Sequence, residues 1–93
     1  MSVHPEIVRL TDELFPLIAS FIEERGSEKV AFIDVVHHLK RQNINGLTFR
    51  NTYPYSYQVE YVVTNLVLKG RLDEEGRFLR LSSYGKKCLD AHR

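Results

Sequence analysis

The spacing of the apolar residues constrains the fold of this chain more than any other feature of the sequence. Up to Lys69, apolar residues recur every three or four positions, which is the period of a helix that buries one face. After Gly70, apolar and polar residues alternate, which is the period of a strand. The sequence therefore predicts helices over most of the chain and a short β-structure near its end.

The first helical pattern begins at Pro5, which suits a first helical turn because its missing N–H would have no partner there. Pro16 interrupts the pattern and disfavours helical geometry at Phe15. We therefore expect a short leading helix, a kink or break near residues 13–16, and a further helix that ends at Arg25. The apolar residues of this stretch are Ile7, Leu10, Leu14, Leu17, Ile18, Phe21 and Ile22.

Two more helices are predicted on either side of an irregular segment, residues 43–53, which contains the turn signal Asn45-Gly46. The helix before this segment ends near Arg41, and residues 29–31 ahead of it are expected to form a short strand. The helix after it opens at Pro54 and closes at Lys69 and Gly70. The expected core residues are Phe32, Val35, Val36 and Leu39 in the former helix, and Val59, Val62, Val63 and Leu66 in the latter.

The alternating stretch over residues 71–81 predicts a β-hairpin whose tip is acidic at Glu74 and Glu75. We expect Phe78, together with Leu72, to cover the helices. Ser82 or Ser83 is then expected to cap a short helix that runs to about residue 91.

Length and composition limit the class of protein. A chain of 93 residues fits one domain, and its only cysteine, Cys88, cannot form an intrachain disulfide, which favours a reducing compartment. The N-terminus has no secretory signal pattern, and no stretch approaches the ~20 apolar residues of a membrane helix. We therefore expect a cytoplasmic protein that does not insert into a membrane. Acidic residues outnumber basic ones up to residue 29 and basic residues prevail afterwards, a bias that permits a nucleic-acid partner.

Two segments give this order of elements a resemblance to the winged helix-turn-helix superfamily. Residues 65–72, NLVLKGRL, resemble the end of the recognition helix as it runs through glycine into the first wing strand. Residues 78–86, FLRLSSYGK, resemble the second wing strand as it enters a capped helix. The resemblance implies a mainly α-helical winged helix domain with a small β-hairpin wing. Its parts would be a helical extension (1–15), a three-helix core (16–70), a wing (71–82) and a C-terminal helix (83–93).

The resemblance further implies a DNA-binding transcriptional regulator, acting as a homodimer, that inserts residues 54–69 into the major groove of duplex DNA. A helical wheel places polar and aromatic side chains of this helix on its outward face and flanks, and arginines elsewhere are candidates for phosphate contacts. The candidate DNA-binding residues are Arg41, Arg50, Tyr55, Ser56, Tyr57, Gln58, Tyr61, Thr64, Asn65 and Arg77, with Lys40 as a further cation.

The outward face also permits a different function. Tyr57, Tyr61, Thr64 and Leu68 follow i, i+4, i+7, i+11 spacing, so this helix is apolar on both sides. Either another part of the chain covers this stripe, or a protein partner does through Tyr57, Tyr61 and Leu68. The alternative function is therefore a winged helix module for protein–protein contact inside a larger complex. Glu60 and the acidic wing favour that alternative, because both repel phosphate.

Other motifs point away from catalysis and metal binding. The adjacent His37 and His38 point about 100° apart on a helix, whereas a metal pair needs i, i+3 or i, i+4 spacing. No glycine-rich phosphate loop, nucleophile elbow or zinc spacing is present, so we expect no catalytic residues, no metal and no cofactor. The aromatic run at residues 53–57 is either a stacking platform for single strands or a pin that holds the loop on the core, and we favour the pin.

Overall fold

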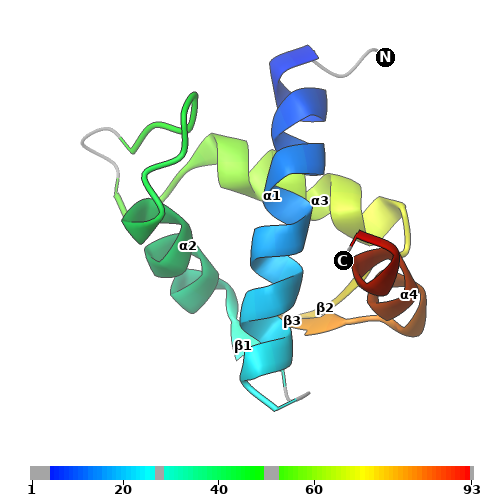
Figure 1. The fold of residues 1–93 in the computed structure, drawn as a ribbon. Helices are drawn as coiled ribbons and strands as arrows, with labels where there is room; N and C mark the ends of the chain where they lie inside the picture. Colours follow the sequence, from blue (N-terminus) through cyan, green and yellow to red (C-terminus); the bar gives the residue numbers. More distant parts are fainter. Residues whose placement is uncertain (1–4, 27–28, 50–52, 93) are drawn as a thin grey trace.

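The computed structural model describes residues 5–26, 29–49 and 53–92. Within these ranges the chain is mainly helical, with four helices and a small three-stranded antiparallel sheet (Figure 1). In chain order the elements are α1 (Pro5–Glu24), β1 (Val30–Ala31), α2 (Phe32–Arg41), α3 (Tyr57–Leu68), β2 (Leu72–Glu75), β3 (Phe78–Leu81) and α4 (Ser83–His92).

Helix α1 is one unbroken helix of 20 residues, so the expected break near residues 13–16 is wrong. Proline removes one helical hydrogen bond, the one to the carbonyl of Asp12, and Asp12 is exposed so that water can replace the missing donor. Leu14, Phe15 and Ile18 are all fully buried, and their packing holds the helix through the proline. The expected break at residues 13–16 leaves Phe15 out of the predicted core, but the structure buries this residue completely.

The predicted strand before α2 is confirmed as β1, which pairs antiparallel with β3 through Val30–Leu79 and Ala31–Phe78. Helix α2 follows without a gap, and its N-cap Ala31 offers no side-chain acceptor. The N–H of Phe32 instead donates to the carbonyl of Arg77 at 2.8 Å. The hairpin therefore supplies the cap that the local sequence lacks.

Helix α3 begins at Tyr57, three residues later than the expected start at Pro54. Ser56 is its N-cap, and the Ser56 hydroxyl accepts from the N–H of Val59 at 3.4 Å. The expected end is confirmed, since Lys69 is the C-cap and Gly70 follows with a φ of 77°.

The hairpin is tighter than expected. Glu74 and Glu75 lie within β2, and the two-residue turn is formed by Gly76 and Arg77. Leu72 faces Leu81 across the hairpin, so the buried face carries Leu79, whereas Phe78 is 43% exposed. The expectation that Phe78 covers the helices is wrong, because neighbouring residues of a strand point to opposite faces and Leu79 takes the inner one.

Of the two serines expected as the cap of α4, Ser82 is the cap, and its hydroxyl accepts from the N–H of Gly85 at 2.9 Å. The same hydroxyl donates to the carbonyl of Gly70 at 2.5 Å, and the end of α3 is thereby tied to the start of α4. Gly85 lies so close to the backbone of Arg71, the residue just before β2, that a Cβ there would overlap the carbonyl oxygen of Arg71.

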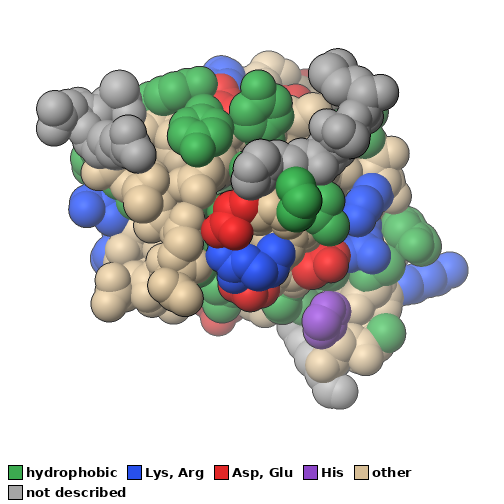
Figure 2. All heavy atoms as spheres, turned by 90° about the horizontal axis from the view of Figure 1, so that it is seen from above, with side chains coloured by type: hydrophobic (Ala, Val, Ile, Leu, Met, Phe, Trp, Pro, Cys, Tyr) green, Lys and Arg blue, Asp and Glu red, His purple; other side chains and the backbone are tan. Residues whose placement is uncertain are grey.

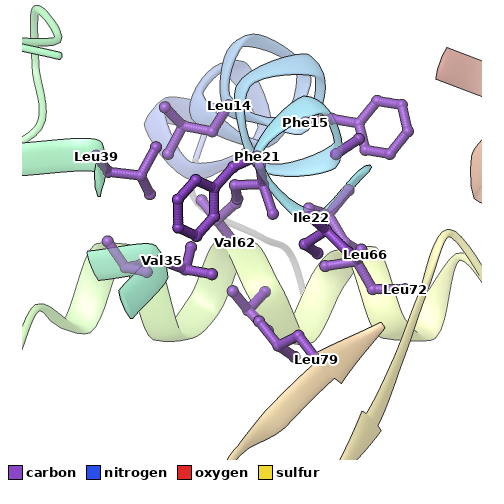
Figure 3. Packing of buried hydrophobic residues seen from close by; sticks show 14 of the residues in the cluster. Leu14, Phe15, Phe21, Ile22, Val35, Leu39, Val62, Leu66, Leu72 and Leu79 are labelled. Carbon is purple, nitrogen blue, oxygen red and sulfur yellow. The ribbon is translucent and has the colours of Figure 1, made fainter. Parts of the chain in front are cut away.

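The core lies between α1, α3 and the inner face of the sheet, and α2 and α4 close it on either side (Figures 1 and 3). Figure 3 shows Leu14, Phe21 and Ile22 of α1 above Val62 and Leu66 of α3, with Leu72 and Leu79 from the sheet below. All eight core residues expected in α2 and α3 are buried. In the described residues no helix combines the length and the apolar character required to span a membrane.

Candidate functional site

The outward face of α3 is the largest group of exposed apolar side chains that one helix presents. Tyr57, Tyr61 and Leu68 are 56%, 58% and 79% exposed, and Thr64 between them is exposed as well. The rings of Tyr57 and Tyr61 meet edge to face, with centroids 6.2 Å apart. Seen from above, hydrophobic side chains gather along the edge of the molecule that α3 forms (Figure 2). The interpretation that another part of the chain covers this stripe therefore does not hold for the described residues.

Two of the candidate DNA-binding residues are buried and stabilise the fold, so they do not contribute to the surface. Ser56 is 5% exposed and caps α3. Gln58 is also 5% exposed; its Oε1 accepts from the N–H of Thr48 at 2.9 Å and its Nε2 donates to the carbonyl of Gly46 at 2.8 Å. Because both side chains already have partners inside the chain, we leave them out of the candidate site. A helical wheel could not reveal this, since the partners of Gln58 come from the irregular loop.

Asn65 lies on the flank of α3 and is half-buried. Its Nδ2 donates to the hydroxyl of Thr11 at 3.3 Å, and that hydroxyl donates to the carbonyl of Ile7 at 2.7 Å. Asn65 thus joins α3 to α1, and its side chain contributes to the packing of the two helices.

Arg77 lies in the hairpin turn and reaches toward α3. Its guanidinium is 3.6 Å from the Glu60 carboxylate, and it lies over the Phe32 ring at 4.3 Å from the centroid. The pair is partly exposed, at 65% for the arginine side chain and 35% for the glutamate. Glu60 therefore lies beside Arg77 as a partly exposed ion-pair partner, a relation that the sequence alone did not reveal.

The remaining candidate cations lie at the end of α2, on the side of the molecule where α3 begins (Figure 1). Arg41 is exposed, and Lys40 places its Nζ over the rings of Tyr53 and Phe49, at 5.0 and 5.6 Å from their centroids. Arg50, which was also a candidate, falls outside the described residues.

The aromatic run ahead of α3 divides into two parts. Tyr53 is held in place, since its hydroxyl forms a hydrogen bond with Nδ1 of His37 and its ring meets Phe49 at 5.7 Å between centroids. Tyr55 is 53% exposed, and Tyr57, the first residue of α3, is exposed to a similar degree (56%). The expected pin therefore applies to Tyr53, whereas Tyr55 is exposed in the segment just ahead of α3.

The charged side chains of β2 face solvent. Glu75 pairs with Lys29 at 3.0 Å, and the hydrogen bond from that lysine holds the pKa of Glu75 below its usual value. Asp73 and Glu74 are exposed beside it. The hairpin thus presents negative charge on its outer edge.

The two adjacent histidines have separate surroundings. His38 stacks on Phe21, with centroids 4.4 Å apart, and burial, followed by the charge of Arg41, lowers its pKa. His37 is turned toward Tyr53. Among the described residues, no three His, Cys, Asp or Glu side chains come together as metal ligands would.

Comparisons with models of known protein families, with curated proteins and with solved structures each found no match to this chain.

Proposed function

We propose that this chain is a winged helix domain that binds duplex DNA through the outward face of α3. The order of elements supports the proposal: a helix, a short strand, two helices and a hairpin, with β1 placed beside β3 so that the sheet order is β1-β3-β2. In a domain of this kind the helix before the hairpin is the one that enters the major groove.

The observation that carries the proposal is the exposure of α3 along its whole outward face. Tyr57, Tyr61 and Thr64 present three hydroxyl groups from one side of a 12-residue helix. Such hydroxyls bond to phosphates and base edges, and the tyrosine rings can pack on thymine methyl groups. A helix at the rim of the molecule can approach the major groove, which is about 12 Å wide.

The distribution of charge indicates which elements would contact the phosphates. Lys40 and Arg41 at the end of α2 lie on the side from which α3 starts, and they are the cations that we assign to the DNA backbone. The hairpin is a poor candidate, because its outer strand is acidic and its turn is hydrogen-bonded to Phe32 of α2. We therefore assign the contact to α2 and α3 rather than to the wing.

The role that we propose for this binding is transcriptional regulation by a homodimer. One 12-residue helix offers few base contacts, and two symmetric copies one helical turn of DNA apart would combine their affinities.

Fluorescence anisotropy with mixed-sequence duplexes at low and near-physiological salt tests the proposal, alongside light scattering for the oligomeric state. We expect salt-sensitive binding that Arg41→Glu weakens about tenfold, with the slope of log K against log salt reduced by about 1. Lys87→Glu makes the same change of charge on the exposed surface of α4 and is the matched control, expected to leave the affinity unchanged.

Absence of binding at low salt would overturn the DNA proposal. A second function would then gain support from one specific observation, the exposure of Tyr57, Tyr61 and Leu68 on a single face. Exposed tyrosines are enriched at protein interfaces, and Glu60 and the acidic β2 suit such a contact better than they suit phosphate. In that case α3 would be the contact face of an interaction module.

A further inference from the structure

Arg71 lies in the bend between α3 and β2, and hydrogen bonds fix its backbone on both sides. Its N–H donates to the carbonyl of Leu66 at 2.9 Å, and the N–H of Gly70 donates to the carbonyl of Val67 at 2.9 Å, so that this pair of bonds closes α3. The carbonyl of Arg71 accepts from the N–H of Ser82 at 3.3 Å. The side chain of Arg71 is therefore attached to a backbone whose position the fold determines.

An arginine is an unusual choice at this position. The second residue after the C-cap of such a helix end is often apolar, because its side chain packs against the last turn of the helix. Arg71 is half-buried there, and its guanidinium carbon lies 5.0 Å from the centroid of the fully buried Phe15 ring of α1. The sequence thus places a charged group where an apolar one would suit the fold.

The guanidinium of Arg71 has no hydrogen-bond acceptor in the part of the chain that the structure describes. Its Nε is buried without a partner, and among the described residues no other buried side-chain nitrogen or oxygen is in this condition. No described carboxylate lies within ion-pair distance, and Asp73, the acidic residue nearest in sequence, stands opposite Arg80 across the hairpin. The terminal nitrogens donate no hydrogen bond to the described chain and are open to solvent.

Arg25 provides a comparison within the same chain. Its guanidinium carbon lies 4.8 Å from the centroid of the Phe21 ring, so its contact with an aromatic ring matches that of Arg71. Arg25 is exposed, however, and water satisfies its donors. Arg71 has lost part of its hydration without gaining a hydrogen bond, which opposes folding. Contact with a ring therefore does not explain why a charged side chain stands at the half-buried position.

The surroundings of Arg71 are basic. Lys69, two residues before it, is exposed and has no described carboxylate within ion-pair distance. His92, the last residue of α4, lies beside the same Phe15 ring, with ring centroids 6.3 Å apart. A guanidinium binds phosphate through two parallel N–H···O bonds, and phosphate carries more negative charge than a carboxylate. This group of donors therefore favours phosphate over a carboxylate.

We propose that Arg71 binds a phosphate group through the edge of its guanidinium that is open to solvent, with Lys69 and His92 as neighbouring donors. The phosphate belongs either to a free phosphate or phosphate ester, or to the backbone of duplex DNA, and the contact is the same in both cases. The first source makes this inference independent of DNA binding by α3. The second extends the proposed DNA contact to the residues that follow α3.

Titration of the whole chain with inorganic phosphate, at an ionic strength held constant with chloride, tests the proposal. The Nε–Hε resonance of Arg71 in 15N NMR spectra reports on the guanidinium itself, and we expect it to shift saturably while that of Arg25 does not. R71M keeps an unbranched side chain that can contact Phe15, and it should raise the Kd of phosphate about tenfold or more. The matched control R25M makes the same change over Phe21 and should leave the Kd unchanged.

The stability of R71M separates phosphate binding from a structural role. Without phosphate, R71M should melt at the temperature of the parent chain or above it, because it removes a half-buried charge that has no hydrogen bond. A melting temperature several degrees lower would assign the guanidinium to the support of Phe15 and overturn the proposal. An Arg71 resonance that phosphate does not shift, or an equal rise of the Kd in R25M, would overturn it as well.

Duplex DNA distinguishes the two sources of the phosphate. A tenfold loss of DNA affinity in R71M, with the slope of log K against log salt reduced by about 1, assigns the contact to the DNA backbone. Unchanged DNA affinity in R71M, with free phosphate no longer bound, assigns the contact to a free phosphate or phosphate ester. A chain that binds phosphate and no DNA would overturn the function proposed for α3 and leave this inference standing.

Discussion

The two faces of α3 both carry apolar side chains but have opposite surroundings. On the inner face, Val59, Val62, Val63 and Leu66 are each exposed by 1% or less. On the outer face, the large side chains are more than half exposed. Valine is a weak helix former, so packing of the inner face, rather than intrinsic propensity, holds the helix. The exposed side chains of the outer face are therefore not needed to stabilise the helix, and they are available to contact a partner.

The largest expected difference is between two neighbouring leucines, Leu66 and Leu68. Leu66→Ala should lower the free energy of unfolding by about 2–5 kcal/mol, because it leaves a cavity in the core. Leu68→Ala removes the same atoms from a side chain that is 79% exposed and should change it by less than about 0.5 kcal/mol. Urea unfolding of both variants measures the two values. Similar losses of unfolding free energy in the two variants would mean that the outer face also stabilises the fold.

A smaller effect is expected at Gln58, which lies between the two faces. Gln58→Ala removes the bonds to Thr48 and Gly46 and should lower the free energy of unfolding by about 1–3 kcal/mol. Thr64→Ala is the matched control, since it removes a polar side chain that is exposed on the same helix. Chemical denaturation followed by tyrosine fluorescence gives both values. A neutral Gln58→Ala would mean that the hydrogen bonds of Gln58 to the loop do not stabilise the fold.

The smallest effect is expected within the outer face itself. A double-mutant cycle of Tyr57→Ala and Tyr61→Ala should give a coupling energy of about 0.5 kcal/mol, the low end for an aromatic pair, because both rings are open to water. The cycle is measured by thermal unfolding of the four proteins. A coupling above about 1.5 kcal/mol would show that the tyrosine pair helps to hold α3 in place.

The sequence predicted the four apolar residues on the inner face of α3, a cap at Ser82 or Ser83, and the strand before α2. Each of these depends on period or on residues a few positions apart, which a single sequence records. The exposure of Tyr57, Tyr61 and Thr64 also follows from a helical wheel, which needs only the residues of that helix, whereas the burial of Gln58 does not.

The errors arose where one element depends on another. The break at Pro16 was expected from the local rule for proline, but residues distant in sequence pack against Leu14 and Ile18 and hold the helix together. The inward placement of Phe78 failed because the hairpin turns at Gly76 and Arg77, which pairs Leu72 with Leu81 and puts Leu79, rather than Phe78, on the inner face. The register set by the turn decides which face each residue of the strand occupies.

The candidate site was affected by the same limit. Ser56 and Gln58 are polar residues at the start of a helix, and nothing in their own segment distinguishes a cap or a loop anchor from a surface contact. The ion pair of Arg77 with Glu60 joins a hairpin turn to a helix, and the contact of Arg71 with Phe15 joins the end of α3 to α1. Such features become visible once the elements are packed together.

The close approach of α4 to the backbone of Arg71, just before β2, limits how this sequence can diverge. A side chain at position 85 would collide with a backbone oxygen, and a backbone oxygen cannot turn aside as a side chain can. Glycine at this position can therefore be replaced only together with a shift of the strand, a double change that selection rarely finds. Its neighbours Tyr84 and Lys87 face solvent and can be replaced without such a shift. In distant descendants of this chain, a glycine three residues beyond the capping serine should outlast most of the surface around it.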